Sequence, residues 1–275
     1  MNIIEFGDCR EIMRKWAFDG VKAQTCVTSP PYFALRDYGV DGQIGQEEMP
    51  EDYVAEMVDV FRCVKDVLHD DGTLFLNIGD TYASNGTYIN AWLEKEENVG
   101  KKNAHSKNAH RYKDRKAVRG GEYKIKAKDL IGIPWRVAFA LQADGWYLRN
   151  SIVWAKPSAL PNPAKDRFNT AHELIFMFAK NKSYKFNKPE SSKDWMEVKT
   201  AQGNGAHFAM FPPDLIAPLI LAGSNEGDVV FDPFMGSGTT AQVALQLGRK
   251  YLGCELNPEY KELQDNRLIV QSLVL

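Results

Sequence analysis

The chain has 275 residues, and 44% of them are hydrophobic, which is enough for one large domain with a sizeable core. Its formal net charge of −2 and isoelectric point near 6.2 exclude an evenly basic nucleic-acid-binding surface, so that such binding requires a local cluster of cations.

Membrane spans, disulfides and metal sites are not expected. No stretch approaches the roughly 18 uninterrupted apolar residues of a membrane helix, and the N-terminus is too short and too acidic for a signal sequence. The four cysteines include no Cys-x-x-Cys pair, which argues against a disulfide framework and a thiolate zinc site. We therefore expect a soluble, cytoplasmic protein that needs no metal.

The chain begins with an apolar run at residues 3–6 that ends at Gly7 and Asp8. Ile12, Met13 and Trp16 then recur at helical spacing. Asp8 therefore lies at a strand-to-helix turn, where aspartate is a preferred N-cap.

A second apolar run, at residues 25–27, leads into the sequence Thr28-Ser29-Pro30-Pro31-Tyr32. Two consecutive prolines remove two backbone donors and fix φ near −65°, so this segment predicts a rigid loop at the end of a strand. Free carbonyls, a hydroxyl and an aromatic ring together suit a planar group that carries an amino function, such as a nucleobase. The alternative is a turn that merely ends the strand.

The rest of the chain alternates between helical and strand patterns, which predicts an open, mostly parallel α/β sheet with helices on both faces. In the first βαβ unit, we expect Gly72 to stop the helix and the next strand to start at Thr73. The expected helices are 50–68, 130–141 and 211–223, and the expected strands are 73–78, 151–154, 174–178, 228–231 and 251–255.

The strand at 228–231 leads into the glycine-rich stretch Asp232-Pro233-Phe234-Met235-Gly236-Ser237-Gly238-Thr239-Thr240 and then a helical pattern. Such a turn lets backbone approach a ligand closely. It is not a phosphate-binding P-loop, since threonines stand where the lysine belongs, and Ala241 replaces the third glycine of a dinucleotide site.

An acidic residue, Glu255, ends the following strand. An acid in this position commonly binds two ribose hydroxyls, and the alternative is a surface carboxylate before the next helix. The glycine turn upstream favours ribose binding.

Together, the Ser-Pro-Pro-Tyr loop and the Asp232–Thr240 stretch resemble the amino-methylating DNA methyltransferases. The catalytic loop precedes the donor-binding glycines, the circularly permuted order of the beta class, and residues 149–157 and 171–174 are also similar to family signatures. The resemblance implies a Rossmann-like catalytic domain over residues 1–275, S-adenosylmethionine as methyl donor, and a protein of a bacterial or phage-encoded type. The donor-binding residues that it implies are Asp8, Thr28, Asp232, Pro233, Phe234, Gly236, Ser237, Gly238, Thr239, Glu255 and Asn257, with Asp8 accepting a hydrogen bond from the adenine amino group.

The resemblance also assigns catalysis to Ser29, Pro30, Pro31 and Tyr32, acting on a base flipped out of the duplex. Tyr32 would stack on the base, while the Ser29 side chain and the Pro30 carbonyl accept hydrogen bonds from its amino group. Serine rather than aspartate at position 29 favours N4 of cytosine. N6 of adenine, an RNA or protein-glutamine substrate, and a non-enzymatic DNA-binding module stay open as alternatives.

A basic insertion at residues 84–128 supplies the local cluster of cations. We expect it to contact double-stranded DNA, although a solvated surface loop is the alternative.

Residues 186–206 are a second candidate recognition segment, and a homodimer and a cognate restriction enzyme stay open. Trp154 is a candidate for the base pocket or the core. The candidate DNA-binding residues are Lys101, Lys102, Arg111, Lys113, Arg115, Lys116, Arg119 and Lys156.

Overall fold

The computed structural model describes residues 1–83, 125, 128–159, 164–189, 193–200 and 211–272. Within these residues the chain forms one eight-stranded sheet with the strand order β1-β8-β7-β2-β3-β5-β4-β6. Neighbouring strands pair in parallel except at β5, which runs antiparallel to both β3 and β4. The strands are β1 Asn2–Phe6, β2 Ala23–Thr28, β3 Leu68–Ile78, β4 Tyr147–Ala155, β5 His172–Ala179, β6 Trp195–Glu197, β7 Val229–Asp232 and β8 Lys250–Glu255.

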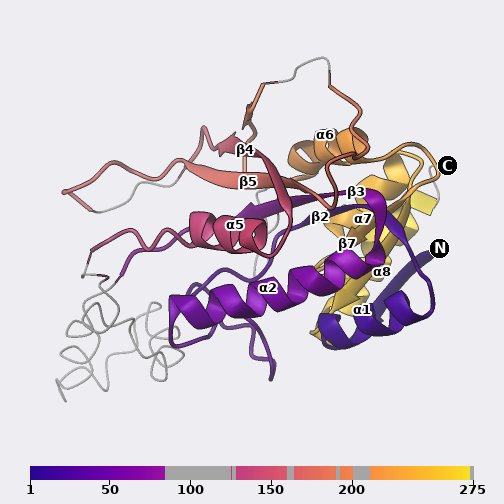
Figure 1. Ribbon diagram of the computed structural model, residues 1–275, viewed down its shortest axis with the longest axis horizontal. Helices are drawn as coiled ribbons and strands as arrows, with labels where there is room; N and C mark the ends of the chain where they lie inside the picture. The colour runs from indigo at the N-terminus through magenta and orange to yellow at the C-terminus, as the bar shows by residue number, and fades with distance from the viewer. Residues whose placement is uncertain (84–124, 126–127, 160–163, 190–192, 201–210, 273–275) are drawn as a thin grey trace.

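Helices cover both faces of the sheet, and Figure 1 shows α1 and α2 below the strands and α6 above them. Helices α1, α2 and α5 pack on one face, and α6 and α7 pack on the other. The predicted α/β architecture is thus confirmed. The helices are α1 Cys9–Phe18, α2 Pro50–Val67, α5 Ile133–Ala143, α6 Pro213–Gly223, α7 Thr239–Gln246 and α8 Lys261–Ser272, with a 3-10 helix, η2, at Pro258–Tyr260.

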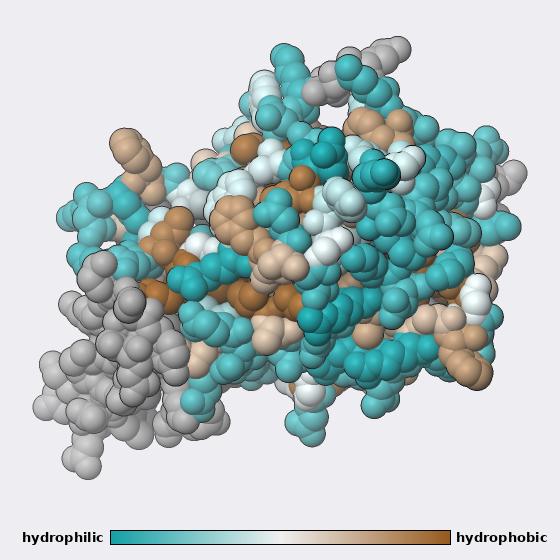
Figure 2. All heavy atoms as spheres, in the orientation of Figure 1, coloured by the Kyte–Doolittle hydropathy of each residue, from teal (hydrophilic) through white to brown (hydrophobic). Residues whose placement is uncertain are grey.

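Successive side chains of each strand point to opposite faces of the sheet, so they fill two hydrophobic cores, one on each face. In β2, Cys26 faces the helices α1 and α2, whereas Val27 faces α6 and α7, and both side chains are buried. Phe176 and Met177 of β5 divide in the same way. Burial on both faces explains why these strands read as continuous apolar runs in the sequence. In Figure 2 most of the visible surface is hydrophilic, with hydrophobic side chains in smaller groups.

The boundary between α2 and β3 differs from the prediction. Helix α2 ends at Val67 and β3 begins at once with Leu68, so that Gly72 lies inside the strand and does not stop the helix. The register against β2 shifts here: Ala23 pairs with Leu68 but Thr25 pairs with Thr73. This bulge accommodates the polar residues 69–71, which broke the apolar pattern and hid the start of the strand.

The short strand β6 was also missed. It pairs in parallel with the end of β4 and falls within residues 186–206, whose polar sequence has no strand period. In the basic insertion, all seven predicted DNA-binding cations lie outside the described residues. Of the part that is described, Ile125 is buried in the core.

The described residues contain no helix long and apolar enough to cross a membrane. They also contain no group of three or more metal-ligating side chains that could hold an ion.

Candidate active site

Four acidic or hydroxyl side chains meet where neighbouring strands end. Asp8 follows β1, Ser29 follows β2, and Asp232 and Glu255 are the last residues of β7 and β8. Since β1, β8, β7 and β2 are adjacent and parallel, their carboxyl ends share one edge of the sheet. Ligands of open α/β sheets bind beyond this edge.

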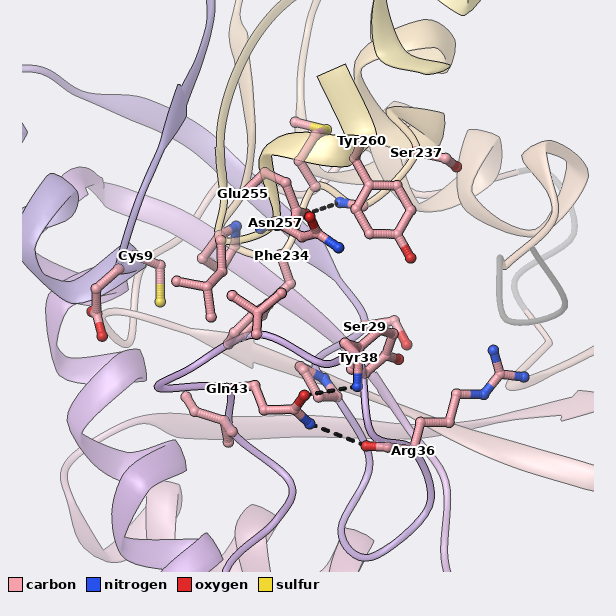
Figure 3. Close-up of a pocket in the computed structure, with 18 of the residues that line it drawn as sticks. Cys9, Ser29, Arg36, Tyr38, Gln43, Phe234, Ser237, Glu255, Asn257 and Tyr260 are labelled. Carbon is pink, nitrogen blue, oxygen red and sulfur yellow. Dashed lines mark hydrogen bonds between the residues drawn. The ribbon is translucent and has the colours of Figure 1, made fainter. Parts of the chain in front are cut away.

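A cavity of about 150 Å³ lies beyond the strand ends. Figure 3 shows Glu255, Asn257 and Tyr260 on one side of it and Ser29 and Tyr38 on the other. We call it the central cavity. Of the predicted site residues, it is lined by Asp8, Ser29, Pro31, Pro233, Phe234, Gly236, Ser237, Thr239, Glu255 and Asn257.

The glycine turn is joined to β8 through Glu255. Its Oε2 accepts a hydrogen bond of 2.7 Å from the Gly236 backbone, and its Oε1 accepts one of 2.8 Å from the Asn257 backbone. Burial raises the pKa of this carboxyl above its ordinary value, although both backbone N–H groups lower it. Each oxygen keeps a second lone pair, so Glu255 retains the capacity to accept two more hydrogen bonds at the cavity wall.

Glycine is required in the turn for conformational reasons. Gly236 and Gly238 have φ values of +53° and +87°, which side chains with a Cβ rarely adopt. Gly238 is the N-cap residue of α7, but it does not line the cavity.

Asp232 lies behind the cavity wall and is fully buried. Its Oδ1 accepts hydrogen bonds from the Thr28 hydroxyl at 2.6 Å and the Phe234 backbone at 3.0 Å, and its Oδ2 accepts one from Thr240 at 2.6 Å. Burial raises the pKa of Asp232 to about 6, against the opposing effect of these donors. Asp232 and Thr28 therefore hold the turn in shape rather than face the cavity.

Asp8 caps α1 and lines the cavity. One of its oxygens accepts a 2.8 Å hydrogen bond from the Arg10 backbone, and the Arg10 guanidinium binds both oxygens. This guanidinium also pairs with Glu56 of α2, and it holds the pKa of Asp8 below its ordinary value. The cap and a ligand-facing role are compatible, because the carboxylate retains acceptor capacity.

Contacts with the protein interior fix the Ser29–Tyr32 loop. The Tyr53 hydroxyl donates a 2.9 Å hydrogen bond to the Pro31 carbonyl, and Pro30 is buried. The Tyr32 ring lies so close to Gly79 that a Cβ there would be 2.5 Å from it. The Tyr32 hydroxyl lies 3.2 Å from the Ser29 hydroxyl and 2.9 Å from a carboxylate oxygen of Glu173.

Lys156 and Trp154 lie beside Glu173, the residue that contacts the Tyr32 hydroxyl. The Lys156 ammonium pairs with Glu173 and sits 4.2 Å from the centre of the Trp154 ring. Trp154 is buried and its indole nitrogen donates to the Val198 carbonyl, which favours the core role for this tryptophan. Lys156 therefore engages protein groups, and its predicted contact with DNA stays a prediction.

A family model described as DNA methylase matches residues 23–266. The chain belongs to this family. It is thus a DNA methyltransferase, as the Ser-Pro-Pro-Tyr loop and the glycine turn indicated.

Curated relatives of this DNA methyltransferase match over nearly its whole length. The type II methyltransferase M.Cfr9I of Citrobacter freundii is 45% identical over 95% of this chain and 86% of the relative. The type II methyltransferase M.SmaI of Serratia marcescens is 42% identical over 96% of this chain and 89% of the relative.

Solved structures show the same fold. The PvuII DNA methyltransferase, described as cytosine-N4-specific, superposes with a TM-score of 0.68 at 23% identity over 97% of this chain and 86% of that one. The complex of M1.HpyAVI with S-adenosylmethionine gives a TM-score of 0.63 at 19% identity over 98% and 99% of the two chains.

The methyl donor of this family is S-adenosylmethionine. The residues that line the central cavity fit this molecule. The Glu255 carboxylate can accept hydrogen bonds from ribose hydroxyls, and the positive-φ glycine turn admits a ligand close to the backbone. Phe234 and Tyr260 add aromatic surface to the same cavity.

The sequence alone missed several residues that line this cavity. Tyr38 and Gln43 come from the loop after the Ser29–Tyr32 segment, where the Gln43 side chain accepts a hydrogen bond from the Tyr38 backbone and donates one to the Arg36 carbonyl. Figure 3 shows both bonds. Two glycines around Gln43 indicated a loop beside the site, but no sequence period shows that this loop lines the same cavity as Glu255.

Proposed function

We propose that the DNA methyltransferase transfers the methyl group of S-adenosylmethionine to N4 of a cytosine flipped out of duplex DNA. The observation that carries this proposal is that Ser29 lines the same cavity as Gly236 and Glu255. A hydroxyl acceptor of the catalytic loop and the predicted donor-binding groups therefore meet in one space.

The central cavity supports a division of roles. Glu255 would bind the ribose hydroxyls of the donor, and the backbone of residues 233–237 would follow its contour. S-adenosylmethionine supplies an electrophilic methyl group when it is bound. Asp8, which also lines the cavity, would accept a hydrogen bond from the adenine amino group.

Ser29 and Pro30 would act on the target base. An exocyclic amino nitrogen is a poor nucleophile because its lone pair is conjugated with the ring. Hydrogen bonds from its two hydrogens to the Ser29 hydroxyl and the Pro30 carbonyl would help the lone pair to leave conjugation. The net change replaces one amino hydrogen by methyl, and that hydrogen leaves as a proton. Tyr32 would stack on the base, with its ring held in place by Gly79 and Glu173.

A covalent cytosine intermediate is not needed. Cys26 precedes the loop but is buried within β2, and burial raises the pKa of its thiol well above the ordinary value. Methylation at carbon 5 of cytosine needs a thiolate at the site. The side chains around Ser29 suit methylation of an amino group instead.

The choice of cytosine depends on Ser29, because serine at this position in the family often accompanies cytosine as the target. Adenine N6 is the alternative in the same chemistry. We further propose that residues 1–275 form a single catalytic domain, and that the cations of residues 84–128 and the 186–206 segment contact the DNA. A homodimer and a partner restriction enzyme are compatible with this function.

The substrate class is tested by transfer of a labelled methyl group from S-adenosylmethionine. Duplex DNA from a host without amino-methylated bases, RNA from the same host and its denatured protein are offered separately. We expect label in duplex DNA, and at least a hundredfold less with Ser29→Ala, whose binding of S-adenosylmethionine should be unchanged. Label in RNA or protein alone would contradict the proposal.

A further inference from the structure

A chain of hydrogen bonds leads from the central cavity into the protein. The Ser29 hydroxyl donates to the Tyr32 hydroxyl at 3.2 Å, and the Tyr32 hydroxyl lies 2.9 Å from Oε2 of Glu173 and 3.1 Å from Oδ1 of Asn77. Ser29 is at the cavity wall, whereas Tyr32, Asn77 and Glu173 are not among its lining residues. Asn77 and Glu173 therefore act on the cavity only through the Tyr32 and Ser29 hydroxyls.

The direction of the chain follows from its inner end. A carboxylate and an amide oxygen can only accept hydrogen bonds, so the Tyr32 hydroxyl must donate its single hydrogen inward. Lys156 pairs with the other oxygen of Glu173, and the Asn77 amide nitrogen donates to Glu173 and to the Leu174 carbonyl, both at 3.2 Å. These contacts fix the acceptors that face Tyr32.

The Tyr32 oxygen is then free only to accept, and it accepts the hydrogen of Ser29. A serine hydroxyl ordinarily rotates and can either donate or accept. Here its hydrogen is directed toward Tyr32, so that only lone pairs remain for the cavity. The lone pairs of the Ser29 oxygen can accept a hydrogen bond from an amino group, but they repel the lone pairs of a carbonyl oxygen.

We propose that the Tyr32 hydroxyl, held by Glu173 and Asn77, is a positioning group that makes Ser29 an obligate acceptor and so selects a base with an exocyclic amino group over the corresponding carbonyl base. The inference rests on the proposed function, but it holds whether the target is cytosine or adenine. Glu173 is a positioning residue in this arrangement, since it reaches the base only through Tyr32 and Ser29.

The test compares binding of two duplexes that carry the target site of the enzyme. One holds the natural target base, and the other holds its carbonyl counterpart, uracil for cytosine or hypoxanthine for adenine. The affinity ratio for the two duplexes is measured with a non-reactive donor analogue. A mismatch also alters the ease of flipping, but this effect is the same for every variant and cancels when ratios are compared.

Tyr32→Phe keeps the ring and removes the hydroxyl, which frees the Ser29 hydrogen to point into the cavity. We expect the preference for the amino base to fall about tenfold and kcat to fall at least tenfold. Binding of S-adenosylmethionine should stay within twofold. An unchanged preference would overturn the proposal, because a role of Tyr32 limited to stacking predicts that result.

Glu173→Gln tests the inner end of the chain. Lys156 requires the amide oxygen, so the amide nitrogen faces Tyr32 and competes with Ser29 for its oxygen. We expect a loss of preference of about threefold, and no further loss when Glu173→Gln is added to Tyr32→Phe. Full additivity would overturn the role of Glu173. Glu226→Gln, in the exposed turn before β7, is the matched control and should behave as the wild type.

Failure of this inference is distinguishable from failure of the proposed function. If the wild type methylates DNA but all variants keep its preference for the amino base, only the inference fails. If the wild type transfers no methyl group to DNA, the proposed function itself fails.

Discussion

The hydroxyl of Thr28 donates a 2.6 Å hydrogen bond to the buried carboxylate of Asp232, although 204 positions separate the two residues. Thr28 ends β2 immediately before the Ser-Pro-Pro-Tyr loop, and Asp232 ends β7 immediately before the glycine turn. The two loops that build the central cavity are thus joined by a hydrogen bond between the residues that immediately precede them. This bond sets their spacing before any ligand binds.

The buried carboxyl of Asp232 predicts a pH-dependent stability. Its pKa is raised to about 6 in the folded protein, from an ordinary value of 3.8. Between about pH 4 and pH 6 the folded state therefore holds more protons than the unfolded state, and the free energy of unfolding falls as pH rises. A shift of about two units corresponds to about 3 kcal/mol at most.

Asp232→Asn removes this titration and keeps the shape of the side chain. We expect the free energy of unfolding of the wild type, measured with urea and taken relative to the variant, to fall between pH 4 and pH 7. The largest expected fall is about 3 kcal/mol. A difference that stays constant over this range would show that Asp232 titrates normally.

Glu255→Gln should weaken donor binding. Both oxygens of Glu255 accept backbone hydrogen bonds, from Gly236 and Asn257. The amide oxygen of glutamine can accept only one of these bonds, because the amide nitrogen cannot accept a hydrogen bond. We expect the Kd for S-adenosylmethionine to rise at least tenfold in calorimetry. Glu259→Gln, an exposed change in η2, is the control and should leave Kd unchanged. Equal Kd values for both variants would show that Glu255 does not take part in binding S-adenosylmethionine.

Gly79→Ala should impair catalysis without affecting donor binding. The added Cβ would lie 2.5 Å from the Tyr32 ring, which must then shift, whereas Gly79 does not line the central cavity. We expect kcat to fall at least tenfold, with the Kd for S-adenosylmethionine within twofold of the wild type. Normal turnover by the variant would show that the observed ring position is not the one used in catalysis.

The sequence predicted the sheet because its strands are buried on both faces and its turns carry proline, glycine or an acid. It also placed Asp8, Ser29 and Glu255 at strand ends, where the structure brings them to one cavity. It could not separate Glu255, which faces the cavity, from Asp232, which faces inward, since both are acids at the ends of parallel strands. That difference depends on Thr28 and Thr240, which pack against Asp232 only in the folded chain.

The Tyr32–Glu173 contact could not be predicted from the sequence, for a related reason. These residues lie 141 positions apart and meet only because β5 inserts antiparallel beside β3. Sequence periodicity gives the existence of a strand but not its neighbour. The segment 171–174 was similar to a family signature, yet its role emerged only from the pairing.

The basic insertion gives a prediction that depends on charge alone. Replacing Lys101, Lys102, Lys113 and Lys116 with glutamine should weaken binding to duplex DNA and reduce the slope of log affinity against log salt concentration. Four exposed lysines outside both proposed DNA-contacting segments, Lys15, Lys182, Lys250 and Lys261, provide the control. If both quadruple variants change the salt slope equally, the insertion has no special role in contacting DNA.

The target base is decided most directly by nucleoside analysis. Duplex DNA of mixed sequence, free of amino-methylated bases, is incubated with the protein and S-adenosylmethionine, digested to nucleosides and examined by mass spectrometry, with Ser29→Ala as the control. We predict N4-methylcytosine with the wild type only. N6-methyladenine in its place would contradict the assignment of cytosine from Ser29, and the absence of any methylated base would contradict the proposed function.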